Sequence, residues 1–189
     1  IHGASVLGPE VTRCLQCSPL EVAAFLQIRN ACPQASPFRL PNCIDIMETV
    51  GNDPTYTHAT LHYGASVATH QWKGDAYAVP GGYSNGFHVY TCEWEPTKIT
   101  FYVDGVLFST RTPNEIQPWP FNHKFYVILN LAVGGDWPGA PDGSTVFPSE
   151  FLIDYVRVYQ GSQDTPTNIV KSNICLLYTS PSPRDRGNH

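Results

Sequence analysis

One hairpin pattern constrains the fold of this chain more than any other feature. Phe101–Val103 and Val106–Phe108 are aromatic and β-branched runs joined by Asp104 and Gly105. Such runs favour strands, and Asp-Gly fits a type I′ turn because both central residues of that turn need a positive φ. Short segments of this kind, separated by turn residues, follow one another along the chain, so a β-sandwich is expected. The predicted strands are Ile44–Glu48, Thr57–Tyr63, Phe87–Trp94, Ile99–Val103, Phe125–Ala132 and Phe151–Tyr159.

The pattern within some of these segments also predicts burial. Phe125–Ala132 is almost entirely apolar, which predicts a central strand covered on both faces. Cys92, Trp72 and Trp94 are expected in the core. One segment, Leu20–Ala31, carries a helical pattern in an otherwise β-rich chain.

Composition narrows the class of protein further. The 189 residues are enough for one domain with a real core. Only 14% are charged and the net charge is −5, which argues against a nucleic-acid partner. No apolar run approaches the ~20 residues of a membrane span. The first residues lack the pattern of a signal peptide, so we expect an internal break before Ile1. We also expect a monomer.

The two ends of the chain differ from its middle. Four of the six cysteines, Cys14, Cys17, Cys32 and Cys43, fall near the N-terminus, where a zinc site and a disulfide are alternatives. Residues 1–42 match the pattern of the middle poorly, and a frame shift within them is one interpretation. Cys175–Asp185 looks like the translation of a sequencing adapter, so residues 175–189 are set aside and 161–174 are interpreted as a linker.

The segment Cys43–Glu48, CIDIME, carries the chemistry. In a regular strand residues 43, 45 and 47 share one face, and Glu48 points to the other. A β-bulge at Met47 would bring Cys43, Asp45 and Glu48 onto one face. Glycoside hydrolysis with retention needs two carboxyl groups about 5–5.5 Å apart. Without further context, two solvated acids on an ordinary strand would be the simpler interpretation.

The wider sequence supplies that context. IDIMETVGNDP, THATLHYG, FHVYTCEWEPTKITFYVDG, WPFNHKFYVILNLAVGGDWPG and DYVRVYQ resemble, in order, the catalytic half of glycoside hydrolase family 16, above all its laminarinases (endo-β-1,3-glucanases). The resemblance implies that residues 43–160 belong to a concanavalin A-like β-jelly-roll sandwich, incomplete at its N-terminal side. It also implies a secreted enzyme that hydrolyses β-1,3- or mixed β-1,3-1,4-glucan with retention.

The resemblance assigns roles to the motif and exposes one departure. The family motif is E-I-D-I-M-E, which makes Glu48 the acid/base and Asp45 the residue that tunes the pair. The nucleophilic Glu should stand at Cys43. A chain without that carboxylate is expected to be inactive or nearly so. We favour a frame error before about Pro41 as the cause, and a diverged β-glucan-binding pseudo-enzyme is the alternative.

Other positions acquire expected roles through the same resemblance. His62 is placed against the sugar, although a half-buried strand histidine is the alternative. Trp119 and Trp137 could stack on pyranose rings or simply pack. No cofactor is required, and Asp154 matches a residue that ligates a structural calcium ion in family members.

Overall fold

The computed structural model describes residues 7–17, 22–30, 42–123 and 125–158, and the structural statements below refer to them. Nearly all of its regular structure is strand, with one short 3₁₀ turn, η1, at Val67–Thr69. The strands are β1 Leu7–Cys17, β2 Val22–Asn30, β3 Cys43–Val50, β4 Asp53–Tyr63, β5 Gln71–Ala78, β6 His88–Glu95, β7 Lys98–Val103, β8 Val106–Arg111, β9 Phe125–Val133 and β10 Glu150–Arg157.

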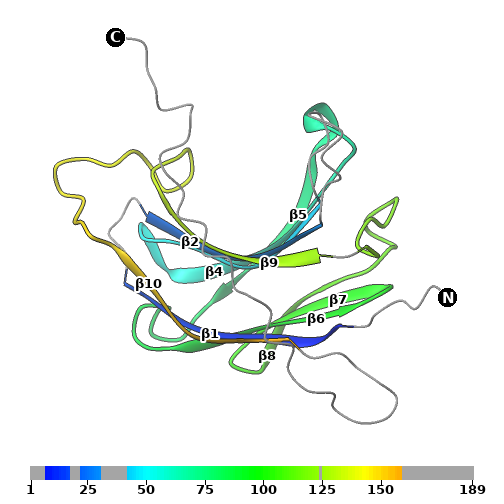
Figure 1. Cartoon of the computed structure of the whole chain (residues 1–189), viewed down its shortest axis with the longest axis horizontal. Helices are drawn as coiled ribbons and strands as arrows, with labels where there is room; N and C mark the ends of the chain where they lie inside the picture. The colour runs from blue at the N-terminus through cyan, green and yellow to red at the C-terminus, as the bar shows by residue number, and fades with distance from the viewer. Residues whose placement is uncertain (1–6, 18–21, 31–41, 124, 159–189) are drawn as a thin grey trace.

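These strands form two five-stranded sheets that lie one above the other (Figure 1). One sheet has the order β10-β1-β6-β7-β8, and the other has the order β5-β4-β3-β2-β9. Each hydrogen-bonded pair of strands is antiparallel. The all-β sandwich expected from the sequence is confirmed. Within the described ranges, no helix has the length and apolar character needed to cross a membrane.

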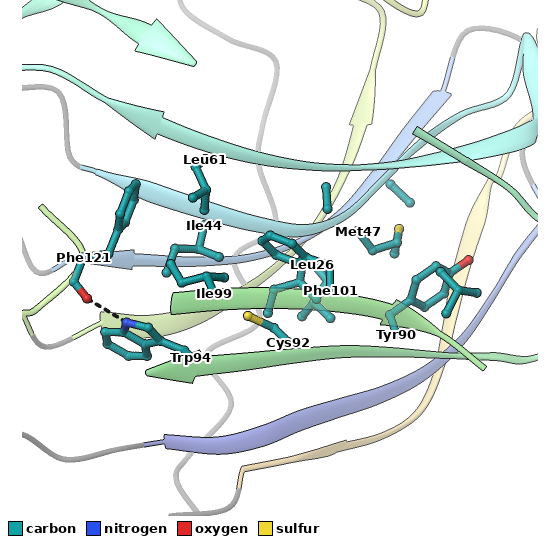
Figure 2. Close-up of a cluster of buried hydrophobic side chains, with 14 of the residues drawn as sticks. Leu26, Ile44, Met47, Leu61, Tyr90, Cys92, Trp94, Ile99, Phe101 and Phe121 are labelled. Carbon is teal, nitrogen blue, oxygen red and sulfur yellow. Dashed lines mark hydrogen bonds between the residues drawn. The ribbon is translucent and has the colours of Figure 1, made fainter. Parts of the chain in front are cut away.

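The core lies between the two sheets and draws on both of them (Figure 2). In β6, buried and half-buried residues alternate along the whole strand, as expected when one face meets the core. Trp94 is buried there, and its indole N–H donates to the backbone oxygen of Phe121 at 2.6 Å. Cys92 is also buried, so both residues lie in the core as predicted. The labelled core side chains are Leu26, Ile44, Met47, Leu61, Tyr90, Cys92, Trp94, Ile99, Phe101 and Phe121.

The predicted hairpin joins β7 to β8. Asp104 and Gly105 have φ values of 50° and 81°, the positive values that a type I′ turn requires. The Asp104 carboxylate also accepts from the backbone N–H of Val89 at 2.8 Å and contacts the His88 ring at 2.7 Å. This turn therefore ties β6 to the β7–β8 hairpin, which an Asn or Gly at position 104 would do less well.

The helix predicted over Leu20–Ala31 is wrong, because this stretch contains strand β2. β2 lies between β3 and β9 and pairs with both along its length. Ala23, Ala24, Leu26 and Gln27 are buried. A strand covered on both faces loses the alternation that marks a half-exposed strand, so its sequence resembles that of a buried helix.

Two further burial predictions are wrong. β9 was expected at the centre of a sheet, but among the described strands it is an edge, paired only with β2, and most of it is half-buried. Trp72 was expected in the core, yet it lies on β5 with 65% of its surface exposed.

The N-terminal segment contributes more than the sequence suggested. β1 lies between β6 and β10, and β2 lies between β3 and β9, so each sheet takes one strand from residues 1–42. Whether this segment is partly out of frame stays a prediction. The expected linker and adapter segments, the side chains of Cys14 and Cys17, and all of Cys32 lie outside the described residues.

Candidate active site

The predicted bulge is present in β3. Asp45 lies opposite Thr60 of β4 and Glu48 lies opposite His58, so three steps along β3 match two steps along β4. The register against β2 shifts at the same place. One extra residue therefore resets the alternation. Asp45 and Glu48 consequently share the outer face of this sheet, which we call the carboxylate face.

The other side of the bulge faces the core. Ile44, Ile46 and Met47 are all buried in the apolar cluster between the sheets. Their burial holds the backbone of the bulge in place, because moving any of them outward would expose apolar surface at about 25 cal/mol per Å². The sequence IDIME thus positions its two acids through the three apolar residues between and before them.

Asp45, Glu48 and His62 form a compact cluster on the carboxylate face. One ligand-type atom from each lies within 4.8 Å of the others. Both acids are buried, and His62 Nε2 lies 3.1 Å from Asp45 Oδ2. Such a group could hold a divalent cation by distance alone. It is equally the arrangement of paired acids and a histidine that acid–base chemistry requires.

Burial and charge set the protonation of Glu48. Loss of water around the carboxylate, and then the negative charge of Asp45, raise its pKa from 4.5 to about 7. The hydroxyl of Thr60 donates to Glu48 Oε2 at 2.6 Å and opposes the shift, as does His62. A carboxyl group with this pKa holds its proton on about half of the molecules near neutral pH, which suits a general acid.

A glycine makes room for the Thr60 contact. Gly74 of β5 lies opposite Thr60, and a Cβ added to it would stand 2.8 Å from Thr60 Oγ1 and 2.9 Å from the backbone oxygen of Ala59. Any larger residue at position 74 would push the hydroxyl that binds Glu48. Gly74 is therefore a positioning residue for the candidate acid.

His62 links the cluster to a second histidine. Its Nδ1 lies 3.0 Å from Nε2 of His70, and the two ring planes are nearly parallel, with 9° between them and centroids 5.1 Å apart. The contacts are satisfied if His62 donates from Nε2 to Asp45 and accepts from His70 at Nδ1. This network fixes the ring of His62 beside Asp45, as its expected place against a sugar requires.

Cys43 lies on the same face, two residues before Asp45. It is buried, and its thiol donates to Asp45 Oδ1. The residue at the expected nucleophile position therefore points into the acid cluster but brings no carboxylate. Its assignment as the replaced nucleophile, like the acid/base role of Glu48 and the tuning role of Asp45, stays a prediction.

The other predicted site residues lie in different places. Trp137 contacts the ring of His58 edge-on, with centroids 5.1 Å apart, and so lies beside the carboxylate face. Trp119 packs against the core and the ring of Phe121, and its buried indole nitrogen has no hydrogen-bond partner among the described residues. Both substrate-binding assignments stay predictions, and the geometry favours that of Trp137.

Asp154 is not part of the Asp45–Glu48–His62 cluster. It is exposed on β10 and directly follows Ile153, which packs against the core as Phe151 does. Calcium takes about six to eight oxygen ligands. In the described part of the chain, the group of side chains with metal-ligand spacing is the one at Asp45, not one at Asp154. The role of Asp154 as a calcium ligand stays a prediction.

Sequence reasoning missed Thr60, His70 and Gly74. Thr60 could have been found, because the alternation in Thr57–Tyr63 already placed it on one face with His58 and His62. His70 and Gly74 had no such signal, since β5 was not predicted as a strand.

A two-layer β-sandwich with paired acids on a bulged central strand fits a carbohydrate-active β-domain. Residues 38–157 match the model of the family described as glycosyl hydrolases family 16. The chain belongs to that family.

Individual relatives agree with this assignment. Over 130 residues the chain is 39% identical to glucan endo-1,3-beta-glucosidase A1 of Niallia circulans, covering 62% of this chain and 19% of that protein. Over 129 residues it is 40% identical to beta-glucanase of Rhodothermus marinus, covering 62% of this chain and 44% of that protein. The chain thus spans less than half the length of either relative.

Solved structures show the same fold. The laminarinase catalytic domain of Thermotoga maritima superposes with a TM-score of 0.74 at 32% identity, over 86% of this chain and 66% of that one. The laminarinase of Rhodothermus marinus gives a TM-score of 0.69 at 29% identity, over 85% and 68% of the two chains. Both structural matches cover a larger share of this chain than the family model does.

Proposed function

We propose that this chain is the sugar-binding and catalytic part of a secreted β-glucan hydrolase, specific for β-1,3- or mixed β-1,3-1,4-linkages. The observation that carries the proposal is the bulge in β3, which puts Asp45 and Glu48 together on the carboxylate face of a family 16 chain. The printed names of the relatives, a glucan endo-1,3-beta-glucosidase and a beta-glucanase, support this substrate class.

The chemistry follows from the two positions at the ends of the motif. In retaining hydrolysis a carboxylate attacks the anomeric carbon while the acid gives its proton to the departing glycosidic oxygen. Water then releases the sugar, with the former acid acting as base. Glu48, with its pKa near 7, is suited to the acid step and the base step.

The attacking carboxylate is missing, and we propose that this chain is inactive or nearly so as written. The Cys43 thiol stands where the carboxylate belongs and is engaged with Asp45. Asp45 in turn is held by His62 at 3.1 Å, so it is oriented as a neighbour of the acid. Glu48 can therefore protonate a leaving group, but no carboxylate takes the sugar.

The second candidate function is β-glucan binding without turnover. The same substitution at Cys43 favours it, because the rest of the carboxylate face is intact. The name of one relative also supports this candidate. The beta-1,3-glucan-binding protein of Penaeus monodon is 33% identical over 143 residues, which cover 58% of this chain and 39% of that protein.

Binding and turnover of laminarin by the unaltered chain test the proposal together. We expect calorimetry to show binding and a reducing-sugar assay to show no release above background. No binding to laminarin or to mixed-linkage glucan would overturn the substrate class. Release by the unaltered chain would show instead that Cys43 does not block the reaction.

A further inference from the structure

Four side chains of the kinds that bind zinc in proteins lie together on the carboxylate face. They are the thiol of Cys43, the carboxylates of Asp45 and Glu48, and the imidazole of His62. One ligand-type atom from each of the last three lies within 4.8 Å of the others. The Cys43 thiol contacts one oxygen of Asp45, and His62 Nε2 lies 3.1 Å from the other oxygen. Sulfur, nitrogen and oxygen atoms are therefore gathered around Asp45.

The strand register brings these four residues together. Cys43 and Asp45 are two apart on β3, before the bulge, so they share a face. His62 of β4 lies directly opposite Cys43, and such cross-strand pairs have Cβ atoms about 4.5–5.5 Å apart. The bulge then adds Glu48 to the same face. All four positions are thus fixed by the pairing of two neighbouring strands.

The spacing of the cluster suits a tetrahedral metal ion. Bonds of about 2.0–2.3 Å place neighbouring ligand atoms about 3.3–3.6 Å apart around zinc. His62 Nε2 and Asp45 Oδ2 are already at 3.1 Å, and the group with Glu48 spans no more than 4.8 Å. Small side-chain rotations can therefore close a ligand shell without moving either strand.

Burial makes a cation favourable at this place. Cys43, Asp45 and Glu48 are all buried. Two carboxylates and a thiolate cannot easily all ionise side by side in a buried site, because each negative charge disfavours the next. A dication offsets that repulsion and binds the ionised forms, so its binding releases the thiol proton to water.

The thiol determines which ion the cluster prefers. Calcium and magnesium take oxygen ligands, and they would suit a cluster made of carboxylates. The family motif has Glu at position 43, whereas this chain has Cys43. A thiolate beside an imidazole favours zinc over calcium and magnesium. The same replacement that removes the nucleophile therefore supplies a zinc ligand.

His70 gives His62 the outer partner that a metal-binding histidine usually has. Its Nε2 lies 3.0 Å from His62 Nδ1. A histidine that binds metal through one ring nitrogen normally donates its other N–H to a neighbouring group. With zinc at Nε2, His62 would donate from Nδ1 to His70. Without metal, the opposite tautomer donates from Nε2 to Asp45, so the same contact serves both states.

We propose that Cys43, Asp45, Glu48 and His62 form a zinc-binding site in which the thiolate takes the place of the nucleophilic carboxylate. This inference does not depend on the proposed glucan chemistry, because it is argued from the types and positions of the ligands. Zinc bound to Glu48 would displace the proton of that carboxyl group. The metal-bound chain would therefore lack its candidate acid.

The test titrates the whole metal-free chain with Co²⁺ and then displaces the Co²⁺ with Zn²⁺. A thiolate ligand gives Co²⁺ a sulfur-to-metal charge-transfer band in the near ultraviolet. Cys43→Ser and His62→Gln each remove one ligand. The matched control is Cys14→Ser combined with Cys17→Ser, because that Cys-x-x-Cys pair is another candidate source of thiolate in the chain. Circular dichroism compares the fold of all the proteins.

We expect the thiolate band in the unaltered chain and in the Cys14→Ser/Cys17→Ser control, and its loss in Cys43→Ser. Both ligand variants should weaken Zn²⁺ binding at least tenfold, because losing even an outer partner costs about 10- to 100-fold. Excess Ca²⁺ should not displace the Co²⁺.

Three results would overturn the inference. They are a thiolate band that persists in Cys43→Ser, an unaltered Zn²⁺ affinity in His62→Gln, and a folded unaltered chain that binds neither metal. His62 is partly exposed, so the second result is open to measurement even if the buried Cys43→Ser variant fails to fold. None of the three bears on the proposed function, which is decided by laminarin binding and turnover.

Discussion

At the scale of single residues, the candidate site is an acid pair whose protonation is set by its surroundings. Glu48 is buried beside Asp45, and both burial and the neighbouring charge favour its protonated form. Thr60 and His62 limit the shift, so the pKa stays near neutral instead of rising further. Glu48 therefore holds a proton on part of the molecules near neutral pH, as a general acid needs.

This shift makes a prediction about folding stability. Because the folded-state pKa of Glu48 is raised, its contribution is fully present below pH 4.5 and is lost as the pH rises through about 7. Glu48→Gln keeps the shape and has no charge to bury. We expect the variant to gain, relative to the unaltered chain, on the order of 2 kcal/mol in unfolding free energy between pH 4.5 and pH 8.

Urea unfolding of both proteins at the two pH values measures this difference. Subtracting one protein from the other removes the contribution of His58, whose pKa is lowered by burial and whose effect runs in the opposite direction. A stability difference that is the same at pH 4.5 and pH 8 would show that Glu48 has an ordinary pKa.

The geometry of the Cys43–Glu48 motif could be predicted from the sequence, whereas the burial of residues around it could not. The spacing in Cys43–Glu48 indicated the bulge, and the bulge is present at the expected place. Trp72 is exposed, so its predicted place in the core is wrong. The prediction failed because its segment has no strand pattern to indicate which face of a sheet the residue occupies. The choice depends on register, which long-range pairing decides.

At the scale of elements, pairing between β4 and β5 controls the candidate acid. Gly74 lies opposite Thr60, and the space left by its missing side chain holds the Thr60 hydroxyl against Glu48. A change in the pairing of β4 with β5 would therefore alter the surroundings of Glu48 without replacing either acid.

Gly74→Ala tests that link. The added Cβ would stand 2.8 Å from Thr60 Oγ1 and 2.9 Å from a backbone oxygen, so the two strands must separate. We expect a loss of about 1–3 kcal/mol in unfolding free energy, typical of overpacking. The Glu48 pKa should also rise above about 7, because the Thr60 hydrogen bond that lowers it is disturbed.

Gly86→Ala is the matched control, since a Cβ there meets nothing within 4 Å. It should leave stability and the Glu48 titration, followed by carboxyl-carbon NMR, near those of the unaltered chain. If Gly74→Ala behaves like this control, the space opposite Thr60 has no positioning role.

The errors of sequence interpretation also lie at this scale. The Ala-Ala-Phe-Leu run of β2 suits a helix by intrinsic propensity, but pairing on both sides makes it a strand. On β9, residues such as Leu129 pack against the core. The opposite face of the strand carries further apolar residues, Ile128 and Ala132. That second apolar face suggested complete burial, although it belongs to the carboxylate face.

At the scale of the whole molecule, the sandwich is completed by strands distant in sequence. β1 lies between β6 and β10, and β2 lies between β3 and β9, so these two early strands pair with segments up to the end of the described chain. Periodicity predicts strands but carries no information about such partners. The sandwich class could therefore be predicted from strand count and turns, whereas the place of the N-terminal strands could not.

The absence of a carboxylate at position 43 matters most at this scale, because it decides whether the chain hydrolyses β-glucan or only binds it. Cys43 and Asp45 alternate normally before the bulge, so Cys43→Glu restores the sequence E-I-D-I-M-E with its first carboxyl on the carboxylate face. Cys43→Glu combined with Glu48→Gln is the control, because it keeps the new carboxylate and removes the acid.

The most direct test is reducing-sugar release from laminarin by Cys43→Glu, measured beside the unaltered chain and the double variant. We predict release by Cys43→Glu alone, with the double variant lower by about 10²- to 10⁴-fold, the usual contribution of a general acid. A Cys43→Glu protein that folds and binds laminarin but releases no more sugar than the unaltered chain would contradict the account.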